Sequence, residues 1–84
     1  MTFFVYILRS KFGVGKFYVG MTTNVEKRLK EHNQGKSKFT SGFIPWTLVH
    51  TESFITRAEA RAREKYLKTG AGRRFLKKLL EERK

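Results

Sequence analysis

The sequence predicts an α+β domain in which three helices flank a three-stranded antiparallel sheet, in the order strand, strand, helix, strand, helix, helix. Two aromatic-rich segments near the N-terminus are joined by a glycine-containing turn, a pattern typical of a β-hairpin. A third strand-like segment follows the only proline, and the remaining segments are amphipathic at helical spacing. The chain has 84 residues, which is enough for one domain spanning residues 1–84.

The hairpin comprises strands over residues 3–9 and 17–21. The first segment is rich in aromatic and β-branched residues and alternates poorly, which favours a strand buried on both faces. Residues 10–16 contain Gly13 and Gly15, which can adopt positive φ and so allow the chain to reverse. The second strand therefore runs antiparallel to the first.

A helix is expected over residues 25–33, because residues 22–24 supply side-chain acceptors for its first free amides. Arg28 lies on or beside its packed face, three residues after Val25 and four before His32. A buried guanidinium needs an anion or a wet edge. Arg28 is therefore a candidate phosphate ligand, although pairing with a carboxylate or extension into solvent would also explain it.

Gly35 is expected to end this helix, and residues 34–45 form a polar connection that lies near the partner. The longest strand covers residues 46–55. A capping box at residues 56–59 begins a second helix, which reaches about residue 69 before three small residues break it. The final amphipathic helix, which precedes a charged tail over residues 81–84, is marked by Phe75, Leu76, Leu79 and Leu80.

Charge is the strongest compositional signal: 19 Lys and Arg against 7 acidic residues give a net charge of +12. Basic residues neutralise phosphates and release condensed counterions, so polyanions are the expected partner. A merely solvated basic surface is the simpler alternative, and acidic lipid is a lesser one. The absence of cysteine excludes disulfides, thiol catalysis and cysteine zinc sites. Without a long apolar run or a signal-peptide pattern, a cytoplasmic location is expected, with nucleoid association as an option.

The chain has no aspartate, and its glutamates divide by position. Glu59 is committed to the capping box, Glu26 and Glu31 are expected on the outer face of their helix, and two more lie in the tail. Glu52 and Glu64 remain as candidate metal ligands. Because a two-metal site needs several carboxylates, the chain is better suited to one divalent cation, Mg²⁺ or Mn²⁺, held by one carboxylate and water.

Hydrolysis of a phosphodiester also needs a cation for the developing charge and a group that takes a proton from water. Arg28 can supply the cation through a two-pronged contact. Tyr6, Tyr18 and the two histidines are the candidate bases, and a tyrosine needs nearby positive charge to lower its pKa from about 10. A place in the core is the simpler interpretation of both tyrosines. Three interpretations of His32 are open: a general base, a phosphate ligand, or a structural residue.

Four segments in this order resemble the signature of the GIY-YIG nuclease family, and the similarity extends over nearly the whole chain. Each segment alone is weak evidence, whereas their combination is specific. The segments are Phe4-Val5-Tyr6-Ile7-Leu8, Phe17-Tyr18-Val19-Gly20, Arg28-Leu29-Lys30-Glu31-His32-Asn33 and Ala62-Arg63-Glu64-Lys65-Tyr66-Leu67-Lys68.

The resemblance implies that Tyr6 and Tyr18 lie at the scissile phosphate, that Arg28 clamps it, and that Glu64 binds the metal. Of the two tyrosines, Tyr6 is favoured as the general base. Gly20 is expected where backbone must approach closely.

The sequence departs from the family pattern at two positions. Phe4 replaces the family's first glycine, which removes backbone freedom rather than a reactive group. Some members also carry an asparagine after the glutamate, and this chain has none beyond Asn33.

These features predict an endonuclease that hydrolyses DNA with one divalent metal, with structure selectivity or weak sequence selectivity, in DNA repair or recombination. RNA is a less favoured substrate. One alternative is a non-catalytic basic module that binds DNA or RNA, and another is a subunit that docks its C-terminal helix on a partner protein. Nucleic-acid contacts are expected from Lys16, His32, Lys36, Lys38, Arg61 and Lys68.

Overall fold

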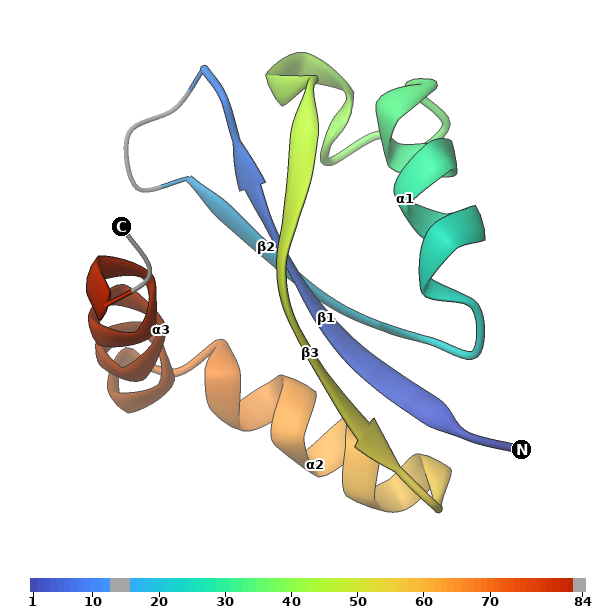
Figure 1. Cartoon of the computed structure of the whole chain (residues 1–84), viewed down its shortest axis with the longest axis vertical. Coiled ribbons are helices and arrows are strands. Elements are labelled where there is room, and N and C mark those ends of the chain that lie inside the picture. The colour runs from blue at the N-terminus through green and yellow to red at the C-terminus, as the bar shows by residue number, and fades with distance from the viewer. Residues whose placement is uncertain (13–15, 83–84) are drawn as a thin grey trace.

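In the computed structural model, which describes residues 1–12 and 16–82, strands and helices follow the predicted order (Figure 1). The α+β class, with a three-stranded antiparallel sheet and three α-helices among the described residues, is confirmed. The turn residues Gly13 and Gly15, for which positive φ was predicted, lie outside the described residues, as do residues 83–84 of the tail.

The sheet places β1 (Phe3–Ser10) between β2 (Phe17–Thr22) and β3 (Trp46–Phe54), and both pairings are antiparallel. The side chains of residues 5–8 are at most 1% exposed, which confirms that the first strand is buried on both faces. β2 pairs with β1 on one side only, so its other edge is available to groups from outside the sheet.

The helices cover opposite faces of the sheet: α1 (Val25–Asn33) lies on one face, and α2 (Arg57–Leu67) and α3 (Gly70–Glu82) lie on the other (Figure 1). Alternate side chains of β1 therefore enter two separate clusters. Val5 and Ile7 pack toward α2 and α3, with Ala60, Leu67 and Leu76. Tyr6 and Leu8 pack toward α1, with Trp46, Val25 and Leu29.

Local signals in the sequence define the helix ends. The side chain of Asn24 accepts a hydrogen bond from the backbone N–H of Lys27 (3.1 Å), and Gly35 has a φ of 78° just after α1. The hydroxyl oxygen of Thr56 accepts from the backbone N–H of Glu59 (3.2 Å). The predicted caps and the glycine stop of α1 are thus confirmed.

The boundary between α2 and α3 differs from the prediction. α2 ends at Leu67, and α3 begins at Gly70, inside the segment that was expected to be a break. A Cβ at Gly72 would lie 2.2 Å from the carbonyl oxygen of Tyr66, so this glycine lets α3 start directly against the end of α2. None of the described helices is long and apolar enough to cross a membrane.

Candidate active site

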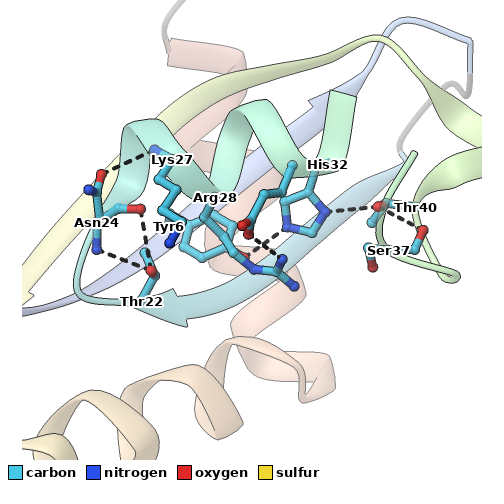
Figure 2. A network of polar contacts seen from close by, with 9 residues as sticks. Tyr6, Thr22, Asn24, Lys27, Arg28, His32, Ser37 and Thr40 are labelled. Atoms are coloured by element: carbon cyan, nitrogen blue, oxygen red, sulfur yellow. Dashed lines mark hydrogen bonds and ion pairs between the residues drawn. The ribbon is translucent and has the colours of Figure 1, made fainter. Parts of the chain in front are cut away.

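Four polar side chains meet between the sheet and α1: Tyr6 from β1, Tyr18 from β2, and Arg28 and His32 from α1. The ring centroids of Tyr6 and Tyr18 are 6.1 Å apart, and those of Tyr18 and His32 are 4.8 Å apart. The hydroxyl of Tyr6 is hydrogen-bonded to Nε2 of His32 at 2.9 Å (Figure 2). We call these four residues the tyrosine cluster. It contains three of the four side chains expected to act on the phosphate.

Gly20 allows the tyrosine cluster to form. The antiparallel register sets it opposite Tyr6, and a Cβ at this position would lie 2.4 Å from the tyrosine hydroxyl oxygen. The phenol of Tyr6 therefore crosses β2 through the space that a side chain would occupy. A close approach at Gly20 was predicted, and the group that makes it in this structure is a side chain of the same chain.

His32 is fully buried, and both of its ring nitrogens have partners. Nε2 meets Tyr6, and Nδ1 is hydrogen-bonded to the hydroxyl of Thr40 at 2.8 Å. Burial and the nearby charge of Arg28 lower the pKa of His32, while Glu31 opposes this shift, so the ring is neutral at pH 7. His32 was expected to contact nucleic acid; in this structure both of its ring nitrogens are occupied by partners within the protein, and that contact stays a prediction.

Thr40 is a member of the site that sequence reasoning missed. It is 1% exposed and directly precedes a 3₁₀ turn over Ser41–Phe43. Its carbonyl oxygen accepts a hydrogen bond from the indole N–H of Trp46 (2.8 Å), and Asn33 binds the backbone of Trp46 at 2.7 and 3.0 Å. No periodic pattern distinguishes Thr40 within its polar connection, so only the folded chain reveals its contact with His32.

Arg28 forms an ion pair with Glu31, with 2.9 Å between a guanidinium nitrogen and Oε1. The expectation that Glu31 lies on the outer face of α1 is wrong, because a spacing of three residues places it beside Arg28. Hydrogen bonding in this pair raises the pKa of Arg28 and lowers that of Glu31. The Arg28 side chain is still 34% exposed, and only some of its N–H donors are used.

Glu64, the predicted metal ligand, lies on α2 and therefore belongs to the other face of the sheet. Its Oε2 accepts from the ammonium of Lys68 at 3.1 Å, and Arg61 approaches Oε1 only to 3.9 Å. Oε1 is buried and has no hydrogen-bond partner among the described residues. No contact described for Glu64 joins it directly to the tyrosine cluster, so its place at the same site stays a prediction.

Glu52, the other candidate metal ligand, already has partners. It accepts two hydrogen bonds from Arg63, at 2.7 and 3.1 Å, and it contacts His50 at 3.0 Å. Within residues 1–12 and 16–82, no three metal-binding side chains cluster around a common point. A divalent cation would therefore depend on one carboxylate plus water, which Mg²⁺ accepts. The unpartnered oxygen of Glu64 fits that requirement, whereas Glu52 does not.

A hollow of about 750 Å³ is lined by residues of β2, of the end of α2 and of α3. Tyr18 belongs both to its lining and to the tyrosine cluster, and Lys68, the ion-pair partner of Glu64, lines it from α2. We call this space the β2 hollow. It connects the tyrosine cluster with the surroundings of Glu64, because Tyr18 lines it from the cluster and Lys68 lines it from beside Glu64.

The five other residues expected to bind nucleic acid are all exposed, as a phosphate contact requires. Lys16 and Lys68 line the β2 hollow, and Lys16 also stacks over the ring of Phe43 at 4.8 Å. Arg61 and Lys68 flank Glu64. The two remaining lysines, on the connection after α1, are Lys36 and Lys38.

Burial distinguishes the two tyrosines. Tyr6 is 1% exposed, and its pKa is raised by burial and by Tyr18, with Arg28 acting in the opposite direction. The expectation that neighbouring cations lower the pKa of Tyr6 is wrong, because desolvation is the larger effect. Tyr18 is only partly buried and lines the β2 hollow. Tyr18 is therefore the more accessible residue of the pair.

Comparison with protein families identifies the class to which this fold and site belong. The family model for the GIY-YIG catalytic domain matches residues 2–78, and the chain belongs to this nuclease family. Members of the family act on nucleic acid and generally depend on a divalent metal.

Within the family, the chain is similar to UPF0213 proteins. The chain is 42% identical to a UPF0213 protein of Staphylococcus haemolyticus over 81 residues, which is 95% of each chain. It is 49% identical to a UPF0213 protein of Halobacterium salinarum over 55 residues, which is 64% of this chain and 71% of the relative. The solution structure of the UPF0213 protein of Bacillus halodurans aligns with a TM-score of 0.57 and 38% identity, covering 94% of this chain and 85% of that one.

Proposed function

We propose that this chain is an endonuclease that hydrolyses phosphodiester bonds in DNA with the help of one divalent cation. The observation that carries the proposal is the meeting of Tyr6, Tyr18 and Arg28, which come from three consecutive elements, in a chain that belongs to a nuclease family. The net charge of +12 supports a polyanionic substrate.

The tyrosines have different roles in this proposal. Tyr18 is the more accessible of the two, so its hydroxyl contacts the scissile phosphate or the attacking water. Tyr6 is buried, and its hydroxyl is hydrogen-bonded to Nε2 of neutral His32, whose Nδ1 is hydrogen-bonded to the hydroxyl of Thr40. These two hydrogen bonds fix the phenol of Tyr6, and the ring of Tyr6 in turn supports the ring of Tyr18. Tyr6 is then a positioning residue, in place of the general base that the family resemblance favoured.

Arg28 supplies the cation for charge that develops on the phosphate. Its pairing with Glu31 orients the guanidinium and leaves N–H donors for two phosphate oxygens. Such donors act most strongly where water is excluded, and the Arg28 side chain, which is 34% exposed, loses more of its water when a substrate covers it.

Glu64 is the residue that would hold the divalent cation, Mg²⁺ or Mn²⁺. When bound, such an ion neutralises phosphate charge and lowers the pKa of a coordinated water. Lys68 and Arg61 flank the carboxylate, and Oε1 has no hydrogen-bond partner among the residues that the structure describes. A buried, unpartnered carboxylate oxygen is costly, which supports a ligand role for Glu64 over a purely structural one.

The expected activity is structure-selective or weakly sequence-selective cutting of DNA in the cytoplasm, in repair or recombination. The alternative is a basic module that binds DNA without cutting it. One observation favours that alternative: Arg28 and Glu64 both already have ion-pair partners within the chain.

A cleavage assay separates the two functions. Supercoiled plasmid and branched DNA are incubated with the chain and Mg²⁺ or Mn²⁺, with and without a chelator, using wild type, Glu64→Gln and the matched control Glu26→Gln on the exposed face of α1. We expect metal-dependent nicking by wild type and the control, and a loss of about 100-fold or more in Glu64→Gln. DNA binding without cutting by any of the three proteins would establish the binding module instead.

A further inference from the structure

We propose that the β2 hollow binds an unpaired nucleotide of the DNA strand next to the bond to be cut, so that the substrate is DNA with a locally single-stranded segment. This inference rests on the proposed nuclease function and specifies its substrate class. It begins from the chemistry of the hollow, which combines cations at its rim with apolar side chains on its floor.

Among the described residues that line the hollow, four are cationic and none is acidic. Lys68 is partly neutralised by Glu64, and Lys16 lies over an aromatic ring. The side chains of Arg73 and Lys77 form no ion pair with any residue that the structure describes. Spaced one helical turn apart on α3, they lie on the same side of the helix and can contact successive backbone phosphates.

The floor is apolar and includes Phe17, which is partly exposed, together with Leu67 and Leu76, which are at most 2% exposed. A site for a small inorganic anion requires neither an apolar floor nor a volume of about 750 Å³. That volume lies within the range of roughly 300–1,000 Å³ typical of pockets for organic ligands. A nucleotide matches both parts, because its base is a flat apolar surface that stacks on aromatic side chains while its phosphate meets the cations.

Tyr18 connects the hollow to the candidate site, since it contributes to both. A strand that presents a phosphate to Tyr18 can therefore extend into the hollow. A base in a duplex must first be unstacked and unpaired, which costs free energy, whereas an unpaired base next to a junction, flap or gap can enter at little cost. This predicts selectivity for the structure of the DNA without any reading of its sequence.

The test measures binding alone, so that it does not depend on cleavage. Fluorescence anisotropy of labelled oligothymidine is followed in chelator, with Glu64→Gln as the parent protein. Arg73→Ala with Lys77→Ala removes two charges from the hollow. The matched control, Arg74→Ala with Lys78→Ala, removes two charges from neighbouring positions of the same helix that do not line it.

We expect the variant with Arg73→Ala and Lys77→Ala to bind oligothymidine about tenfold more weakly than its parent. The number of counterions released on binding, measured from the salt dependence of the affinity, should fall by roughly one. The affinity of the control should change less than about threefold. Equal losses in both double variants would overturn the proposal, because they would indicate a diffuse basic surface. Circular dichroism of each variant verifies that it is folded.

A second arm tests the floor. The parent is expected to bind oligothymidine more tightly than an abasic sugar-phosphate strand of equal length, and Phe17→Leu should reduce this preference at least threefold. Equal binding of the two strands by the parent would exclude a base in the hollow. Since neither arm requires cutting, a chain that binds in this way but never cleaves would contradict the proposed function and leave the hollow assigned. A chain that cleaves DNA but binds oligothymidine and the abasic strand equally would support the proposed function and contradict the assignment of the hollow.

Discussion

The two faces of the sheet hold polar groups in opposite ways. Under α1, Tyr6, His32 and Thr40 are at most 1% exposed and are joined in one hydrogen-bonded chain. Under α2, Glu64 is flanked by Lys68 and Arg61, and one of its oxygens is buried without a hydrogen bond. The first arrangement satisfies its members within the protein, whereas the second is complete only if something else binds.

This difference does not reflect a general shortage of partners on the α2 face. Glu52 there receives two hydrogen bonds from Arg63, whose guanidinium also lies over the rings of Tyr66 and Phe75 at 5.3 and 5.0 Å. A carboxylate on that face can therefore be satisfied when its role is structural. We infer that the tyrosine cluster is preorganised by folding, while Glu64 is left partly unsatisfied for a ligand, as is common at functional sites.

The largest effect on stability is expected on the α1 face, from Gly20→Ala. The new methyl group would lie 2.4 Å from the hydroxyl of Tyr6, so either the ring or β2 must move. Overpacking of this kind costs about 2–3 kcal/mol. Urea unfolding followed by circular dichroism measures the change. The matched control is Gly42→Ala, where a Cβ meets nothing within 4 Å. Equal stabilities of the two variants would contradict the close packing of Tyr6 over β2.

Sequence patterns predicted the elements well, because hydrophobic periodicity and caps act locally. Helix α1 has the predicted bounds, and the capping box at Thr56 begins α2. Contacts between distant segments could not be predicted in this way. The bond from His32 to Thr40 depends on how a connection without periodicity folds back, and Glu31 looked exposed because its partner Arg28 was assigned to the packed face. Burial, which decides the pKa of Tyr6, is likewise a property of the whole fold.

A smaller effect is expected from Thr40→Val, which keeps the shape of the side chain and removes its hydroxyl. Nδ1 of the buried His32 would lose its partner, at a cost of about 1–2 kcal/mol. Nicking activity should fall as well, because the ring that holds Tyr6 is less well fixed. Thr40→Ser keeps the hydroxyl and should recover both properties. A valine variant as stable and active as the serine variant would show that this hydrogen bond has no role in positioning Tyr6.

The pH dependence of stability tests the same network through His32. Its folded pKa is lowered, so as the pH falls below about 6.5 the unfolded chain binds a proton first. Stability should therefore decrease on acidification from this point, by at most about 1.4 kcal/mol per pH unit, until the folded ring is also protonated. Unfolding of wild type and His32→Gln between pH 7.5 and 5.5 isolates this contribution.

If His32→Gln does not fold, NMR titration of the His32 ring protons in wild type gives the same information. The ring should remain neutral at pH values where an ordinary histidine is half protonated. A midpoint at or above the ordinary value would mean that burial does not control this group, and that the tyrosine cluster is more open to water than the structure indicates.

The smallest effect on stability is expected from Glu64→Gln, the change expected to abolish cutting. The substitution removes a charge that has one close ion pair, with the exposed Lys68, and such pairs contribute little. The change in unfolding free energy should be below about 0.5 kcal/mol. Added Mn²⁺ should raise the thermal midpoint of wild type but not that of Glu64→Gln, since a ligand stabilises only the state that binds it. If Glu64→Gln were strongly destabilised, Glu64 would have a structural role, like the fully hydrogen-bonded groups of the α1 face. The two faces of the sheet would then no longer differ in how they hold their polar groups.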